Sequence, residues 1–266
     1  MPPTVNPSAS IKERIANTDG LPRCTVPGCT RPTMAATGVG LSEFRCKAHN
    51  AHRARHGSEW CPTYKASDLK PFLQVSAKWI KERRTETSIA HALIGLKGLL
   101  DGSGEALPAQ DIKRHSAASR ARVAFARLRE ANVKPERLLA IHMAVSALIE
   151  DDLGSHRVPE FRIVQVAKCA HRLASGTHRH WDWPLDNGTT APLAFHAYPK
   201  SSGRVLRVIG GELEEICAGV SERDLQAIRN LKLARFGPHP SRLPGWRPLW
   251  ARQRDGGAAM KSRGTL

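Results

Sequence analysis

Four residues near the N-terminus have the types and spacing of a metal site. Cys24 and Cys29 are separated by four residues, Cys46 and His49 by two, and sixteen residues lie between the pairs. Two close pairs of thiolate and imidazole groups are the ligands of tetrahedral structural zinc. A Pro-Gly turn inside the first spacer can bring both sulfurs to one side, and the second spacing places its two side chains on one face of a helical turn. The sequence therefore predicts a zinc centre.

The ligand set favours a structural role for this metal over a catalytic one. Four protein ligands close the coordination sphere, whereas catalytic zinc keeps one position open. A segment of roughly forty residues cannot bury enough apolar surface to fold alone, so the metal must stabilise it. Spacing leaves one alternative open, in which His52, His56 or Cys61 supplies the fourth ligand.

A resemblance to a known kind of module appears in this segment. The pattern reads Cys24-x4-Cys29-Thr-Arg31-Pro32, then Arg45-Cys46-Lys-Ala-His49-x3-Arg53-x2-His56-Gly57. It resembles small zinc modules of bacteriophage and mobile-element proteins, some of which lie beside HNH nuclease domains. The resemblance covers residues 21–57 only. It implies that the two cysteines of the first pair and the Cys and His of the second hold the metal, and that the basic residues after the histidine face nucleic acid.

The composition points to a polyanionic partner. The 266 residues include 41 Lys and Arg against 24 Asp and Glu, a formal net charge of +17. Such an excess favours nucleic acid, DNA or RNA, over a neutral small molecule, although a GC-rich gene would also enrich Arg. No apolar run approaches the length of a membrane span, and residues 1–10 lack a secretory signal. We therefore expect no membrane partner and a cytoplasmic protein, nucleoid-associated if it binds DNA, with reduced cysteines.

The remaining pattern predicts a mainly α fold, in which a small zinc-binding module leads into a helical domain with a short β/loop insertion. We expect a flexible lead-in over 1–20 with a short helix at 11–16, the module over 21–60, the helical domain over 65–235 and an extended basic tail over 236–266. Apolar periodicity predicts helices over 67–101 (one, or two joined near 85), 110–131, 135–151, 159–175, 212–217 and 222–235. A loop is predicted over 177–203 and a strand over 204–209. Cys169 and Cys217 are expected to pack as small apolar groups.

Two helices carry the candidate contacts with nucleic acid. The helix that follows the metal ligands can reach phosphates if the metal holds it rigid. Residues 212–235 also fit a helix-turn-helix, whose second helix presents polar groups to base edges. A solvated basic face and a plain helical hairpin are the simpler interpretations, and for residues 212–235 the hairpin is favoured. The candidate contact residues are Lys47, Arg53, Arg55, Gln226, Arg229 and Lys232.

Two further regions could carry chemistry or binding. His171, His178 and His180 precede Asp182 and suggest a second metal site or an acid–base pair, although their spacing matches no ligand pattern and a His-rich surface is the simpler interpretation. The C-terminal tail interleaves Arg and Trp, which can bind a single strand or a protein partner, or anchor the tail to the protein itself. The tail residues concerned are Arg242, Trp246, Arg247, Trp250, Arg252 and Arg254.

These features together predict a non-catalytic, zinc-containing protein that binds nucleic acid. A regulatory or accessory role is expected, and the phage or mobile-element context comes from the resemblance alone. The first alternative is a metal-dependent enzyme acting on DNA, such as a nuclease or recombination component, that uses the region from His171 to Asp182. The second is a zinc-stabilised module that binds another protein.

Overall fold

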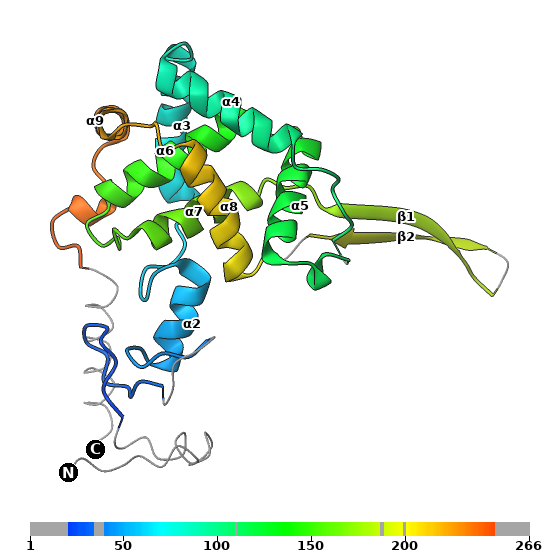
Figure 1. Ribbon diagram of the computed structural model, residues 1–266, viewed down its shortest axis with the longest axis horizontal. Helices are drawn as coiled ribbons and strands as arrows, with labels where there is room; N and C mark the ends of the chain where they lie inside the picture. The colour runs from blue at the N-terminus through cyan, green and yellow to red at the C-terminus, as the bar shows by residue number, and fades with distance from the viewer. Residues whose placement is uncertain (1–20, 35–39, 110, 187–188, 199–200, 248–266) are drawn as a thin grey trace. The chain divides into compact units, whose positions relative to one another are not determined.

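The computed structural model describes residues 21–34, 40–109, 111–186, 189–198 and 201–247 (Figure 1). The predicted lead-in, with its helix at 11–16, and most of the predicted tail lie outside these ranges. The chain divides into two compact units, one containing Met1–Pro62 with Gly245–Leu266 and the other Thr63–Pro244. The fold is mainly α, as predicted.

The described elements are eight α-helices, two short 3-10 helices and one pair of strands. In chain order they are α2 (Lys47–His56), α3 (Ala66–Glu82), α4 (Thr87–Asp101), η1 (Asp111–Arg114), α5 (Ala117–Glu130), α6 (Pro135–Asp151), α7 (Pro159–His171), β1 (Thr177–Pro184), β2 (Thr190–Ala197), α8 (Gly203–Ile216), α9 (Glu222–Phe236) and η2 (Pro240–Arg242). None of the described helices is both long enough and apolar enough to cross a membrane.

Helix α6 forms the centre of the larger unit. It packs against α3, α4, α7, α8 and α9, and every residue from Leu138 to Ile149 is buried. A helix that is buried on all sides must lie inside the core, so α6 is surrounded by other helices instead of packing through one face only. Pro135 occupies the first turn, where its missing N–H breaks no helical hydrogen bond. The other helices of the unit surround it in Figure 1.

Two adjacent glycines of α8 provide a matched test of this packing. A Cβ on Gly210 would lie 2.8 Å from the carbonyl carbon of Ile163 in α7 and closer still to its oxygen, whereas a Cβ on Gly211 would meet nothing within 4 Å. We expect Gly210→Ala to cost about 2 kcal/mol of unfolding free energy or more, because backbone cannot yield cheaply. Gly211→Ala should stabilise by about 0.5–1 kcal/mol through helix propensity. Urea unfolding of both variants measures the two changes in unfolding free energy. Equal changes would contradict the close approach of Gly210 to the backbone of Ile163.

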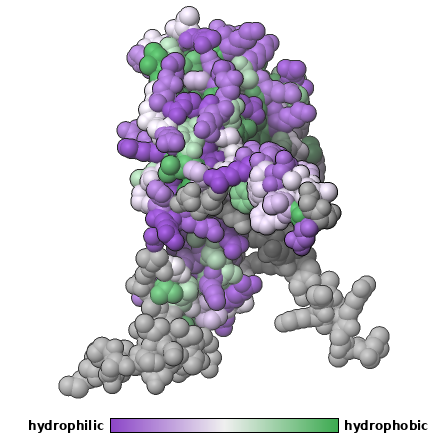
Figure 2. All heavy atoms as spheres, turned by 90° about the vertical axis from the view of Figure 1, so that its right-hand side faces the viewer, coloured by the Kyte–Doolittle hydropathy of each residue, from purple (hydrophilic) through white to green (hydrophobic). Residues whose placement is uncertain are grey.

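The predicted loop over 177–203 is instead an antiparallel hairpin of β1 and β2 that projects from the helices in Figure 1. Its base is held by Arg127, a buried residue whose guanidinium donates to the Ser175 carbonyl at 2.9 Å, the Leu107 carbonyl at 2.6 Å and the Thr177 hydroxyl at 2.8 Å. Figure 2 looks onto the side from which the hairpin projects and shows a mostly hydrophilic surface with small hydrophobic patches.

One face of the hairpin is apolar and exposed. The residues concerned are Trp181, Trp183, Leu193 and Phe195, each at least 38% exposed. Strand alternation places the histidines of β1 on the opposite face.

Several predicted boundaries are wrong for local reasons. The strand predicted over 204–209 is the first half of α8, because the Ser202 hydroxyl caps the helix and Val205, Leu206, Ile209 and Leu213 recur at helical spacing and are buried. The helix predicted over 110–131 is divided, since Ser116 caps α5 by accepting from the N–H of Ser119. Residues 237–244, predicted as tail, belong to the larger unit.

Candidate metal centre

The structure brings together the four residues singled out by their spacing. The Sγ atoms of Cys24, Cys29 and Cys46 and a ring nitrogen of His49 all lie within 4.8 Å of one another. His49 Nδ1 is 3.3 Å from the sulfur of Cys24 and 3.5 Å from that of Cys46, and the sulfurs of Cys29 and Cys46 are 3.9 Å apart. The group can hold a metal ion.

Neither a disulfide nor a different fourth ligand accounts for this cluster. A disulfide needs sulfurs about 2.05 Å apart, well below the Cys29–Cys46 separation, and all six cysteines are free. The alternative fourth ligands considered from spacing stay outside the convergent group. His52 has its Nδ1 2.8 Å from the Ser58 carbonyl and stacks on His56.

Local backbone geometry positions the first ligand pair. The N–H of Cys29 donates to the Val26 carbonyl at 3.0 Å, which closes a turn over Pro27 and Gly28. Gly28 has φ 79°, a value that glycine adopts without strain. The turn brings Cys24 and Cys29 to the same side, as the Pro-Gly pair predicted.

The second ligand pair begins a helix. Cys46 is the N-cap of α2, and His49 lies in its first turn. Gly57 ends the helix in the left-handed conformation, with its N–H donating to the Arg53 carbonyl. The helix expected to follow the metal ligands is thereby present as α2, and its start coincides with the second ligand pair.

The two thiols of Cys29 and Cys46 differ in acidity. Burial raises the pKa of Cys29, and the neighbouring thiols of Cys46 and Cys24 add to this. Burial opposes ionisation of Cys46 as well, yet its pKa is lowered because the backbone N–H groups of His49 and Ala48 and the adjacent thiols bond to its thiolate. A helix N-terminus favours a thiolate in this way, so α2 prepares one ligand in its metal-binding form.

Metal affinity of the centre should rise with pH. Burial, with the charges of Arg31 and His52, lowers the pKa of His49, so its ring is already neutral near pH 7. Cys29, with its raised pKa, must lose a proton on binding, and each displaced proton changes the apparent affinity about tenfold per pH unit. Competition with a chromophoric chelator between pH 6.5 and 8 measures the slope. A pH-independent affinity would mean that Cys29 is not a ligand.

The predicted contact residues of α2 differ in their surroundings. Lys47 and Arg55 are exposed, whereas Arg53 is half-buried and lies 3.7 Å from Glu59. The same carboxylate pairs with Arg45 at 2.6 Å. Glu59 therefore neutralises part of the charge on one side of the helix, and Lys47 and Arg55 present theirs to solvent.

Lys232 is a wrong prediction among the contact residues of α9. Its side chain is 5% exposed and its ammonium donates to the Asp151 carboxylate at 2.9 Å, so it cannot reach a phosphate. Arg229 is 18% exposed and pairs with Glu222 and Glu150 at 3.2 and 3.8 Å. Gln226 is exposed and bonds to Asn230 at 2.8 Å.

Helices α8 and α9 have different main packing partners, although both also contact α6. Ser221 caps α9 and forms a capping box with Asp224. Helix α9 nevertheless packs on α3 and α6, while α8 packs on α7 and α5. The two helices are anchored separately, which does not favour a helix-turn-helix that docks as a unit.

The histidines of the second candidate region do not gather as the sequence order suggested. His171 ends α7, where burial and the nearby Arg120 and Arg127 lower its pKa. The ring contacts of His178 and His180 are with partners on and beyond β2. Cys217 packs in the core as predicted, and burial raises its pKa to about 12.

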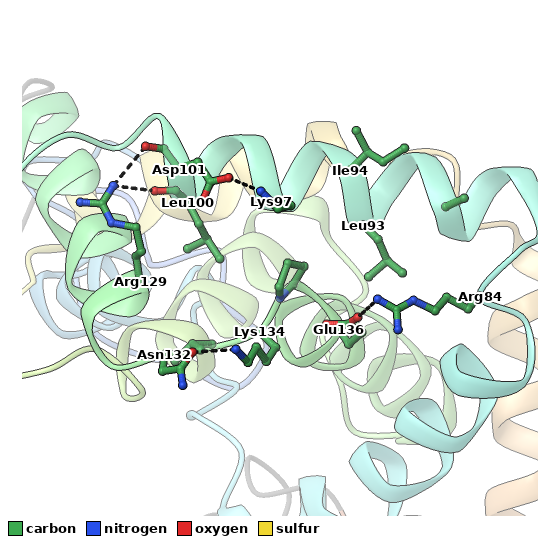
Figure 3. Close-up of a pocket in the computed structure, with 13 residues that line it drawn as sticks. Arg84, Leu93, Ile94, Lys97, Leu100, Asp101, Arg129, Asn132, Lys134 and Glu136 are labelled. Atoms are coloured by element: carbon green, nitrogen blue, oxygen red, sulfur yellow. Dashed lines mark hydrogen bonds and ion pairs between the residues drawn. The ribbon is translucent and has the colours of Figure 1, made fainter.

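A hollow of about 530 Å³ lies on the larger unit, where α4 faces the connection from α5 to α6 (Figure 3). Its cations are each engaged by nearby protein groups. The pairs are Arg84 with Glu136 at 2.7 Å, Lys97 with Asp101 at 2.5 Å, Lys134 with Asn132 at 2.7 Å, and Arg129 with the Leu100 and Asp101 carbonyls at 3.1 Å. Because these cations are already paired with protein groups, the hollow is a weaker candidate for a binding site than the Cys3His cluster.

Fold and site together define a mainly helical protein with a Cys3His group, close to its N-terminus, that could hold a metal ion. A scan against protein-family models, a search of curated proteins and a search of solved structures each give no match to this chain. The functional argument therefore rests on the chemistry of the site.

Proposed function

We propose that residues 21–62 form a zinc-stabilised module that binds nucleic acid, with DNA as the preferred partner, and that the protein has a non-catalytic regulatory or accessory role. The observation that carries the proposal is the Cys3His cluster at the start of a helix whose exposed face is basic. The phage or mobile-element context follows only from the resemblance of the ligand pattern.

The ligand set and its dimensions support zinc. Zn–S and Zn–N bonds of about 2.3 and 2.05 Å give tetrahedral edges of about 3.8 Å between sulfurs and about 3.6 Å between sulfur and nitrogen. The observed Cys29–Cys46 separation of 3.9 Å and the Cys–His49 separations of 3.3 and 3.5 Å are close to these edges. Thiolate-rich sites also disfavour magnesium and calcium, which prefer oxygen ligands.

The charge balance of the module supports an anionic partner. Residues 21–62 contain six Lys and Arg against two Glu. A zinc ion with three thiolates carries a net charge of −1, so the module stays positive when loaded. Lys47 and Arg55 are exposed on α2. A metal bound at the start of this helix would fix the positions of their two charges. Phosphate contacts from such a surface make affinity strongly dependent on salt.

Binding to a short duplex as a function of salt tests the proposal. In Lys47→Gln/Arg55→Gln the slope of log affinity against log salt should become shallower by up to about 1.8, or roughly 0.9 for each lost phosphate contact. Lys78→Gln/Lys97→Gln is the matched control, because it removes the same charge from exposed side chains of α3 and α4. Arg53→Gln is measured separately, since Arg53 also pairs with Glu59.

Three outcomes separate the candidate functions. A shallower slope in the α2 variant alone supports the proposal. Equal slopes in both double variants would contradict the assignment of Lys47 and Arg55. A wild-type chain that retards neither duplex nor single strands at low salt would reject nucleic-acid binding and favour the protein-interaction alternative. Repeating the titration with single-stranded DNA and with RNA identifies the preferred form.

A further inference from the structure

The strand register brings together histidines that lie far apart in the sequence. In the β1–β2 pairing His178 is directly opposite His196, and His180 lies two residues along β1 from His178. Successive side chains of a strand alternate between faces, so all three imidazoles share one face of the hairpin. His196 follows His178 by eighteen residues and was not a candidate from spacing.

One pair of these rings is in close contact and the third ring lies beside it, although among the described residues the ligand atoms of all three do not lie within 4.8 Å of one another. Nδ1 of His178 is 2.7 Å from Nδ1 of His196. The ring centroid of His196 is 5.0 Å from that of His178 and 5.5 Å from that of His180. The trio lies near the hairpin base, which Arg127 anchors through Thr177. The backbone that carries His178 is thus attached to the helical unit.

Nothing in the fold requires these imidazoles to gather. All three residues are exposed, so they fill no core. The large apolar side chains, Trp181, Trp183, Leu193 and Phe195, lie on the other face. Asp182, on the histidine face, is opposite Pro192 and further from the base, and the ring of Tyr198 contacts His178 edge-on. Imidazole binds metals through the lone pair of a ring nitrogen that carries no proton.

The geometry points to a second metal site, in which His178, His180 and His196 bind one zinc-class divalent ion through three imidazole nitrogens and leave at least one position open to water. Imidazole ligands select zinc, copper and nickel over magnesium or calcium. Zn–N bonds of about 2.05 Å set the nitrogens about 3.3 Å apart, so His178 and His196 separate slightly and His180 turns its ring inward. The open position distinguishes this site from the Cys3His group, whose four ligands close the sphere.

Calorimetric titration with Zn²⁺ tests the site on the full chain already loaded with one equivalent of zinc. We expect a second equivalent to bind, and His196→Ala and His180→Ala each to weaken it at least tenfold. His91→Ala, which removes an exposed histidine from α4, is the matched control and should leave binding unchanged. Because the replaced side chains are exposed, far-UV circular dichroism of the variants should match that of the wild type.

Cobalt separates the two sites independently of the proposed function. Co²⁺ at the Cys3His group gives a sulfur-to-metal charge-transfer band, whereas Co²⁺ at three histidines gives only weak visible bands. A second equivalent of Co²⁺ that adds visible absorption without charge transfer, and does so less readily in His196→Ala, supports the proposal. A chain that takes up only one equivalent, or a second equivalent indifferent to all three histidines, would overturn it and leave the first site unaffected.

Discussion

Replacing Cys24 and Cys46 together with serine should abolish metal binding at the Cys3His group and unfold residues 21–62, while the unit formed by Thr63–Pro244 stays folded. The reason is the composition of the small core. Its buried members are Cys24, Val26 and Cys46, and Cys29 and Trp60 pack against them half-buried. Three of these five residues are proposed ligands. Helix α2 contributes no buried residue, so a metal bound to the proposed ligands would take the place of a hydrophobic core.

The expected loss of folding free energy is large because, on the proposed function, metal binding supplies most of the free energy that folds the module. Structural zinc sites in small domains supply about 10 kcal/mol or more at pH 7, whereas a core of this size supplies only a few. Elemental analysis of the purified chain gives the stoichiometry. Limited proteolysis with mass analysis then locates the unfolded segment, with cleavage expected within residues 21–62 in the double variant and after treatment with a strong chelator.

The control for this experiment is Cys169→Ser, because Cys169 lies on α7 in the larger unit and outside the metal-binding group. That variant should keep the wild-type metal content and the wild-type cleavage pattern. A double variant that still gave the sulfur-to-metal charge-transfer band with Co²⁺, or that resisted proteolysis over 21–62, would show that the module folds without these ligands.

The candidate site was predictable from sequence because its determinants are local. Each ligand pair is made by neighbours in the chain, and the Pro-Gly turn and the helix start that orient them are short-range signals. His196 shows the opposite case. Its meeting with His178 depends on how β1 and β2 pair, and register is set by the turn and by both strands together. No spacing within one segment encodes that contact.

Errors in the helical domain have a similar origin. Residues 204–209 are rich in Val and Ile and resemble a strand, but Ser202 caps a helix there and α7 accepts its apolar face. Lys232 reads as a surface residue because lysine is seldom buried unless paired. Its partner is Asp151 at the end of α6, which is 81 positions away in the chain. Tertiary pairing decided both cases, whereas the apolar pattern of residues 135–151 was strong enough to predict α6 from the local sequence alone.

Asp151→Ala should be among the most destabilising single substitutions in the larger unit, at about 3–5 kcal/mol. The carboxylate of Asp151 accepts from Lys232 of α9 at 2.9 Å and from Arg242 of η2 at 2.7 Å. The side chains of Asp151 and Lys232 are only 12% and 5% exposed. Removing the acid leaves a buried ammonium without its partner, and Arg242 keeps only its hydrogen bonds to the Asp151 and Glu150 carbonyls.

Thermal unfolding measures this effect, and a cost of that size lowers the midpoint of a unit this large by about 10 °C. Lys232→Met should cost less, because a methionine fills a similar volume beside Phe72 and leaves Asp151 paired with Arg242. Lys97→Met is the surface control, since the Lys97–Asp101 pair is exposed and such pairs contribute little. If Asp151→Ala lowered the midpoint no more than Lys97→Met, the pair would be solvated, and Lys232 would again be a candidate for phosphate contact.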